Sequence, residues 1–271
     1  MGAIIVSSLN QKGGVGKTTT IFNLGGQLTK EGYRVLLCDV DPQASLSQGF
    51  FGPEVVRSLP KESCVAALFD DAGVVPVEAL IRPTNVTNLS LIPSARHLNP
   101  YNIPEPRFAG FTQVALRDAL NDVRSSFDWV LIDCPPNLGL CSWSALTASD
   151  FLLVPFQPED FGCQGIFEID QTFQAVRAST NGHLQLAGYL LTMVKRRAMH
   201  RAYEELLRKS YGNKVFTVTI PDAAVFTEAI PKGLPLSHFK PNTVAGRSIR
   251  DLAAELQSRI ATLNDQNREV A

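Results

Sequence analysis

Few folds can accommodate the glycine-rich stretch KGGVGKTTT at residues 12–20 of this chain. It follows the short β-branched run Ala3 to Ser8, which is typical of a buried strand. It precedes residues 18–30, where apolar side chains recur at the spacing of a helix. A strand, a glycine loop and a helix in this order predict an α/β fold with a parallel sheet.

The same order of elements recurs along the chain. Further strands are predicted at the apolar runs Arg34 to Cys38, Trp129 to Ile132, Phe151 to Pro155, Leu184 to Thr192 and Val215 to Ile220. Helices are predicted near residues 112–125, 161–179, 198–211 and 246–263. Nearly continuous Val, Ile and Leu runs that alternate with helices are typical of a mostly parallel central sheet flanked by helices on both faces.

Length and composition agree with one globular unit of this kind. The chain has 271 residues, of which 45% are hydrophobic and 19% charged, so a packed core is expected and general disorder is excluded. We interpret residues 1–271 as a single domain. Within it, the proline-rich residues 52–106 are interpreted as an elaboration at the sheet edge, and residues 264–271 as a polar tail.

Cysteine content and hydropathy indicate the compartment. The five cysteines are odd in number and contain no CxxC pair, which favours reduced thiols over a disulfide framework or a Cys-rich zinc site. No apolar run approaches the roughly 18 residues of a membrane span, and residues 1–9 lack the basic start and cleavage site of a secretory signal. We therefore expect a cytoplasmic protein.

The glycine-rich stretch has the chemistry of a phosphate-binding loop. The usual pattern, G-x-x-x-x-G-K-[ST], requires a glycine where this chain has Gln11. The backbone N–H groups can still converge on phosphate oxygens, while Lys17 can reach the β- and γ-phosphates and Thr18 can ligate Mg²⁺. The residues expected to bind the nucleotide here are Gly13, Gly14, Val15, Gly16, Lys17, Thr18 and Thr19. The alternative is a glycine-rich turn without a ligand.

Carboxylates follow two of the other predicted strands. Asp133 ends the run that starts at Trp129, and a carboxylate there can hold Mg²⁺ through water. Asp39 and Asp41 alternate at the end of the second run, so we expect both to point toward the same face. The alternative is a charged strand terminus followed by a turn at Pro42.

Six segments carry a resemblance that covers most of the chain apart from parts of residues 52–106. They are KGGVGKTTT, VLLCDVDPQ at Val35 to Gln43, VLIDCPP at Val130 to Pro136, and residues 144–165, 190–197 and 214–229. With these segments the chain resembles the deviant-Walker P-loop ATPases of the ParA and MinD superfamily. The resemblance implies Mg²⁺-dependent hydrolysis of ATP, slow in the protein alone, and an ATP-dependent homodimer.

The resemblance also implies roles for single residues. The catalytic residues are Lys12, Lys17 and Asp41. The residues around the metal are Thr18, Asp39 and Asp133, and those lining the adenine are Met193, Pro221 and Asp222. Lys12 would cross the dimer interface to the partner's nucleotide, as an arginine finger does, and Asp41 would orient the attacking water. Glu159 is either a contact across the dimer near the nucleotide or a solvated loop carboxylate.

Charge is distributed unevenly along the chain. The whole chain has a net charge of -1, whereas residues 195–271 contain thirteen Lys and Arg against eight Asp and Glu. The residues expected on a DNA-binding face are Lys195, Arg196, Arg197, Lys232 and Arg250; the alternative is a solvated surface with scattered charges. Asp222 departs from the family, because it stands where partition ATPases commonly have the arginine of an Ile-Pro-Arg segment. Binding to DNA should be directed at the backbone and sensitive to salt.

The expected function is ATP-dependent positioning or segregation of a cargo, which is a plasmid, a chromosome or a protein assembly. The dimer would bind double-stranded DNA of the nucleoid nonspecifically, and a ParB-like adaptor would stimulate hydrolysis. Two alternatives stay open, a MinD-like membrane-associated ATPase and a P-loop enzyme that acts on a small molecule. Residues 261–271 are polar and offer a membrane no aromatic anchor, which disfavours the first alternative.

Overall fold

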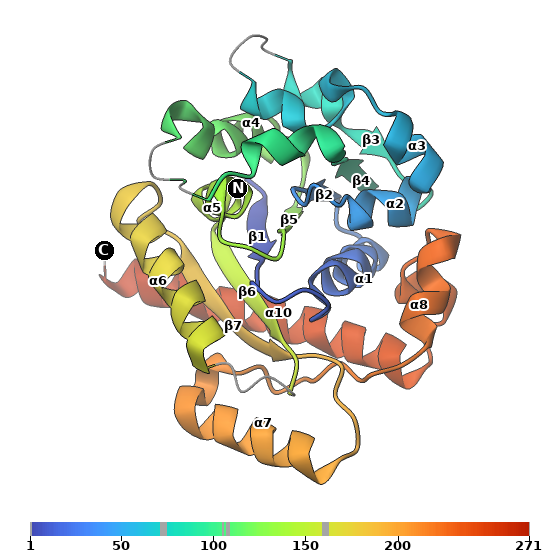
Figure 1. Ribbon diagram of the computed structural model, residues 1–271. Coiled ribbons are helices and arrows are strands. Elements are labelled where there is room, and N and C mark those ends of the chain that lie inside the picture. The colour runs from blue at the N-terminus through green and yellow to red at the C-terminus, as the bar shows by residue number, and fades with distance from the viewer. Residues whose placement is uncertain (1, 71–74, 105, 107–108, 159–162, 271) are drawn as a thin grey trace.

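A seven-stranded sheet forms the centre of the molecule (Figure 1). The computed structural model describes residues 2–70, 75–104, 106, 109–158 and 163–270. The strands are β1 (Ile4–Ser8), β2 (Val35–Asp39), β3 (Arg82–Pro83), β4 (Leu89–Ile92), β5 (Trp129–Asp133), β6 (Phe151–Phe156) and β7 (Gln185–Leu191). Their order is β3-β4-β2-β5-β1-β6-β7, and the strand pairs are parallel except for β3 with β4. The predicted α/β fold with a mostly parallel sheet is confirmed.

Helices cover both faces of this sheet. They are α1 (Lys17–Lys30), α2 (Ser45–Phe51), α3 (Pro53–Ser58), α4 (Ala115–Val123), α5 (Leu140–Ala148), α6 (Cys163–Ser179), α7 (Ala198–Tyr211), α8 (Val225–Ala229), α9 (Leu236–Phe239) and α10 (Val244–Val270). In the two cores, α4, α5 and α6 pack on one face and α1 and α10 on the other. On β5, Val130 and Ile132 belong to the first core and Trp129 and Leu131 to the second. Because successive side chains of a strand point to opposite faces, burying both sets requires a helical layer on each side.

The predicted strand at Val215 to Ile220 is wrong. The segment lies beside β7 and makes only scattered backbone hydrogen bonds with it. The N–H groups of Thr217 and Val218 donate instead to the carboxylate of Glu255 on α10, both at 2.8 Å. Since a side chain takes these donors, they are not available for a strand ladder.

Helix boundaries differ from the prediction in two places. A separate 3₁₀ turn, Gly110–Gln113, precedes α4 in the region predicted as one helix over residues 112–125. Helix α10 continues to Val270 rather than ending near residue 263, because the polar residues that follow include no glycine or proline to stop it. The start of the predicted helix at residues 161–162 lies outside the described residues. Within the described residues, no helix is long and apolar enough to cross a membrane.

Candidate nucleotide site

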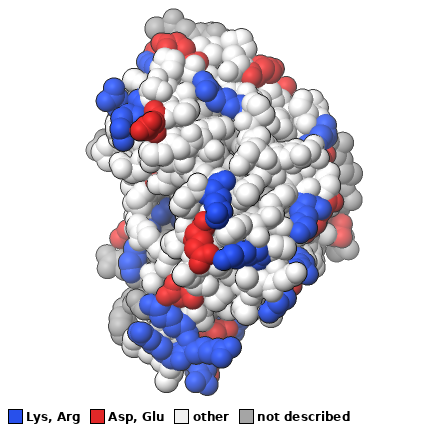
Figure 2. Space-filling view, turned by 90° about the vertical axis from the view of Figure 1, so that its right-hand side faces the viewer, with Lys and Arg blue, Asp and Glu red and all other residues white. Residues whose placement is uncertain are grey.

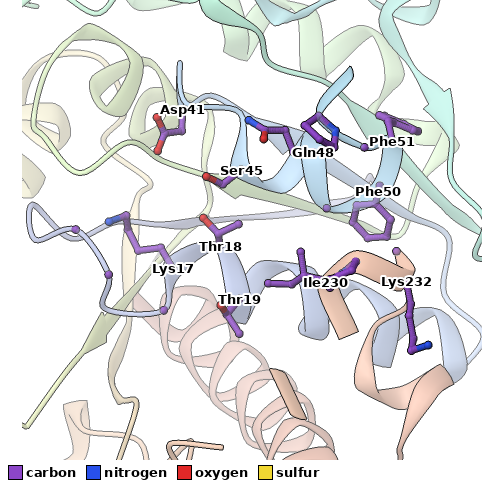
Figure 3. A pocket seen from close by; sticks show the side chains of 18 of the residues that line it. Lys17, Thr18, Thr19, Asp41, Ser45, Gln48, Phe50, Phe51, Ile230 and Lys232 are labelled. Carbon is purple, nitrogen blue, oxygen red and sulfur yellow. The ribbon is translucent and has the colours of Figure 1, made fainter. Parts of the chain in front are cut away.

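The glycine loop joins β1 to α1 at the carboxyl edge of the sheet, where Figure 3 shows it from close by. Gly14 and Gly16 have φ angles of 77° and 85°, a region that only glycine adopts at low cost. Gly16 caps α1, and its carbonyl accepts the first helical hydrogen bond from Thr20 at 2.9 Å. The first N–H groups of α1 therefore have no helical partner, which is the arrangement that binds phosphate.

Two buried side chains support the leading limb of the loop. The Asn10 side chain accepts a hydrogen bond from the Lys12 backbone N–H at 2.9 Å and donates one to the Pro155 carbonyl at 2.8 Å. Lys17 is only 6% exposed, and its ammonium donates to the Lys12 carbonyl at 3.0 Å. Burial lowers the pKa of Lys17, and the neighbouring Asp133 opposes this shift. Lys12 itself is exposed at the surface of the loop.

Asp133 and Thr18 lie together at the base of the loop. The Thr18 hydroxyl donates to Asp133 Oδ2 at 2.6 Å, whereas Oδ1 of this fully buried carboxylate has no hydrogen-bond partner. Burial raises the pKa of Asp133, and the nearby Asp39 raises it further. A buried carboxylate with a free oxygen beside a hydroxyl and an ammonium fits a Mg²⁺ ion that is held through water and phosphate. No cluster of three or more His, Cys, Asp or Glu side chains in the described part of the chain could hold a metal by itself.

Asp39 and Asp41 differ in their access to the cavity. Strand β2 ends at Asp39, so the alternation that predicted a common face does not extend to Asp41. Asp41 lines the cavity beside the loop, whereas Asp39 is fully buried and is not among the cavity's lining residues. Burial raises the pKa of both carboxyls. Asp133 is likewise fully buried and absent from the lining, so the role expected for Asp39 beside the metal stays a prediction.

A cavity of about 890 Å³ opens over the loop. Its lining includes the predicted residues Gly13, Gly14, Gly16, Lys17, Thr18, Thr19, Asp41 and Met193. Val15 is buried beneath the loop, and Pro221 and Asp222 are not among the lining residues. The opposite wall comes from α2 and from a 3₁₀ turn, Ile230–Lys232, and it brings Ser45, Gln48, Phe50, Phe51 and Ile230 to the cavity (Figure 3). Sequence reasoning missed this wall; the only signal for α2 was its position directly after the DVDPQ segment.

The two segments expected to line the adenine are joined to each other. Val194 and Pro221 form an isolated parallel bridge, directly after Met193, whose φ is 54°. The Lys195 ammonium lies 3.3 Å from the Asp222 carboxylate, so the residue that departs from the family pairs with a residue expected to contact DNA. Glu159 lies outside the described residues.

The other basic residues expected on a DNA face lie on separate elements. Arg196 and Arg197 are exposed just before α7, and Figure 2 shows basic side chains gathered at the lower end of the molecule, where α7 lies in Figure 1. Arg250 is on α10. The Lys232 side chain turns away from the glycine loop (Figure 3), and its ammonium lies 5.2 Å from the centre of the Phe239 ring.

Comparisons with known proteins identify the family of this chain. A family model described as an AAA domain matches residues 3–186. The chain is 37% identical to the sporulation initiation inhibitor protein Soj of Bacillus subtilis, over 94% of this chain and 98% of that protein. It is 35% identical to the chromosome partitioning protein ParA of Caulobacter vibrioides, over 94% of each. This chain belongs to the ParA family of ATPases.

One similar solved structure contains a bound nucleotide analogue and magnesium. Cobyrinic acid a,c-diamide synthase from Mycobacterium smegmatis, with bound ATP analogue and magnesium, matches this ParA-family ATPase with a TM-score of 0.78 and 28% identity, over 93% of each chain. The resemblance to the ParA and MinD superfamily is thus confirmed, and the chain is an enzyme that hydrolyses ATP. Nucleotide and magnesium are bound by a homologue of the same fold.

Proposed function

We propose that this ParA-family ATPase positions or segregates a cargo by binding DNA nonspecifically as an ATP-dependent homodimer. Full-length similarity to Soj and to a chromosome partitioning protein carries this proposal. The cargo is a plasmid, a chromosome or a protein assembly, and a ParB-like adaptor on the cargo stimulates hydrolysis. The protein then acts in the cytoplasm, at the nucleoid.

We assign the roles at the site to residues that line the cavity or lie at the base of the glycine loop. The loop N–H groups and Lys17 hold the phosphates, and Thr18 with Asp133 would hold the Mg²⁺, which neutralises charge on the phosphates when bound. Asp41 orients the attacking water, because its carboxylate reaches the cavity. Met193 contributes to the adenine side.

Dimerisation through Lys12 is supported by the exposure of this residue on a limb that Asn10 anchors. Lys12→Ala should bind ATP but stay monomeric or fail to hydrolyse it. Asp41→Ala should hold ATP and accumulate as dimer, because the water is no longer oriented. Size-exclusion chromatography with light scattering, in ATP and in ADP, tests both variants. Identical oligomeric behaviour of the two would refute the division of roles.

Nonspecific DNA binding is supported by the exposed basic residues before α7 and by the doubling of any such surface in a dimer. An electrophoretic shift on random-sequence duplex should appear with ATP and be much weaker with ADP, and it should weaken steeply as salt increases. The double variant Arg196→Ala, Arg197→Ala should reduce the logarithmic salt slope by about 4, one unit per lost phosphate contact, because each of the two subunits loses two contacts. The absence of any ATP-specific shift at low salt would argue against DNA as the track.

A second candidate function has one observation in its favour. The solved structure described above is an enzyme whose name specifies a small-molecule product. A P-loop enzyme of that kind should hydrolyse ATP only with its small substrate present, whereas a positioning ATPase should hydrolyse ATP slowly alone and faster with DNA and its adaptor. Phosphate release by the purified chain in ATP and Mg²⁺ separates the two.

A further inference from the structure

Asp39 is the most completely bonded carboxylate near the nucleotide site. Its Oδ1 accepts a hydrogen bond from the backbone N–H of Asp41 at 3.1 Å. Its Oδ2 accepts two more, from the N–H of Ser47 at 2.9 Å and from the Ser47 hydroxyl at 2.7 Å. Three of the roughly four acceptor positions of a carboxylate are thereby taken by protein donors.

Asp133 provides a contrast on the adjacent strand. The two residues are register partners between β2 and β5, and both are fully buried. Asp133 keeps one oxygen without a hydrogen-bond partner, whereas both oxygens of Asp39 are bonded. Of these two carboxylates, Asp133 is therefore the one with an oxygen still available to bind a cation.

Ser47 extends the network to a third segment. Its hydroxyl, which donates to Asp39, also accepts a hydrogen bond from the backbone N–H of Ser94 at 2.9 Å. Ser94 follows β4, so one buried hydroxyl joins the end of β2, the first turn of α2 and the end of β4. Removing that hydroxyl leaves the buried Ser94 N–H without an acceptor and takes one of its three donors from the buried Asp39 carboxylate.

The segment between Asp39 and Ser47 depends on these bonds. Ala44, which precedes α2, has a φ of 55°, and no side chain makes a capping hydrogen bond at the N-terminus of this helix. This left-handed conformation is costly for a residue other than glycine and persists only where the surroundings impose it. The network holds both ends of the segment, and along it Asp41 and Ser45 reach the cavity (Figure 3).

We propose that Asp39 and Ser47 are positioning residues for ATP hydrolysis. They hold the Asp41 backbone and the first turn of α2, so that the Asp41 carboxylate stays beside the cavity, and Asp39 takes no part in binding the metal. The inference rests on the role proposed above for Asp41.

The test compares Ser47→Ala with Ser47→Thr, which restores the hydroxyl. In Ser47→Ala, kcat should fall between roughly tenfold and a hundredfold, as expected when a partner that orients a catalytic group is lost. The KM for ATP should stay within about twofold because the phosphate loop is unchanged, and Ser47→Thr should recover most of the rate. The control is Ser149→Ala, which removes a buried hydroxyl that donates to the Ala145 carbonyl at 2.7 Å, and neither residue lines the cavity. This variant should leave kcat unchanged.

Two further measurements separate positioning from metal binding. Without nucleotide, hydrogen–deuterium exchange over residues 40–51 should be faster in Ser47→Ala than in the unmodified protein and in Ser149→Ala. In Asp39→Asn, kcat should fall while the Mg²⁺ concentration for half-maximal activity stays the same. A Mg²⁺ requirement raised about tenfold or more in Asp39→Asn would overturn the proposal, as would an unchanged kcat in Ser47→Ala. An unchanged kcat in Asp41→Ala would instead refute the role of Asp41 itself.

Discussion

The contact between Glu255 and the segment that replaces the predicted last strand should be measurable as stability. Glu255 Oε2 accepts the N–H of Val218, and Oε1 accepts the N–H of Thr217 and the Nε of Arg259 at 2.9 Å. In Glu255→Gln, the single amide oxygen can serve Thr217 and Arg259, so the half-buried Val218 N–H faces an amide group that cannot accept. An unsatisfied N–H of this kind costs about 1–2 kcal/mol, and the lost charge weakens the remaining bonds by about 1 kcal/mol. We expect the free energy of unfolding to fall by about 2–3 kcal/mol at pH 7.

The pH dependence of this loss gives a second check. Burial raises the pKa of Glu255, but the hydrogen bonds from Thr217, Val218 and Arg259 together outweigh it, so that the folded-state pKa is lowered. A lowered folded-state pKa means that the stabilisation is present above the unfolded pKa of about 4.3 and is lost as pH falls through the folded-state value. The difference between the unmodified protein and Glu255→Gln should therefore shrink below about pH 4.

Urea unfolding followed by circular dichroism at pH 7, 4.5 and 3.5 measures both effects. At pH 7 the midpoint should shift by about 0.7–1 M, taking a slope of about 3 kcal/mol/M. The matched control is Glu204→Gln on α7, where Glu204 also pairs with an arginine four residues on, Arg208, at 2.7 Å. That surface pair should contribute no more than about 0.5 kcal/mol. Equal losses in the two variants, or a loss that does not depend on pH, would refute the reasoning.

Three further predictions follow from single contacts. Lys17→Ala should weaken ATP binding about a hundredfold or more by calorimetry, because the phosphates lose a charge-assisted partner worth about 3 kcal/mol; undiminished affinity would exclude Lys17 from the site. Gly26→Ala should destabilise the fold by about 1–3 kcal/mol in thermal or urea unfolding, because an added Cβ would lie 2.2 Å from the Pro235 Cβ, and an unchanged midpoint would contradict that packing. Asp222→Ala should tighten ATP-dependent DNA binding and steepen the salt slope by about 2, because Lys195 is released in both subunits, and unchanged binding would place Lys195 off the DNA-binding face.

The parts of the site that the sequence could predict are those determined by local chemistry. A loop that needs left-handed backbone at Gly14 and Gly16 leaves a glycine pattern that is readable without a structure. An acidic residue at the end of a continuous apolar run, such as Asp133, is readable for the same reason, because parallel strands deliver their last residues to one edge. Strand alternation could not place Asp41, because it applies only within a strand and β2 ends at Asp39.

By itself, therefore, the sequence determined the mostly parallel α/β fold, the phosphate loop and the family, since each depends on residues close together in the chain. Only the tertiary structure decided what residues distant in the chain do to one another. Folding places the 3₁₀ turn Ile230–Lys232 beside α2, where both line the cavity. It also lets the backbone N–H groups of Thr217 and Val218 donate to Glu255. It also aims Ser47 at Asp39 and at Ser94. Each of these outcomes depends on which buried donor finds which acceptor, and that is settled by packing rather than by local pattern.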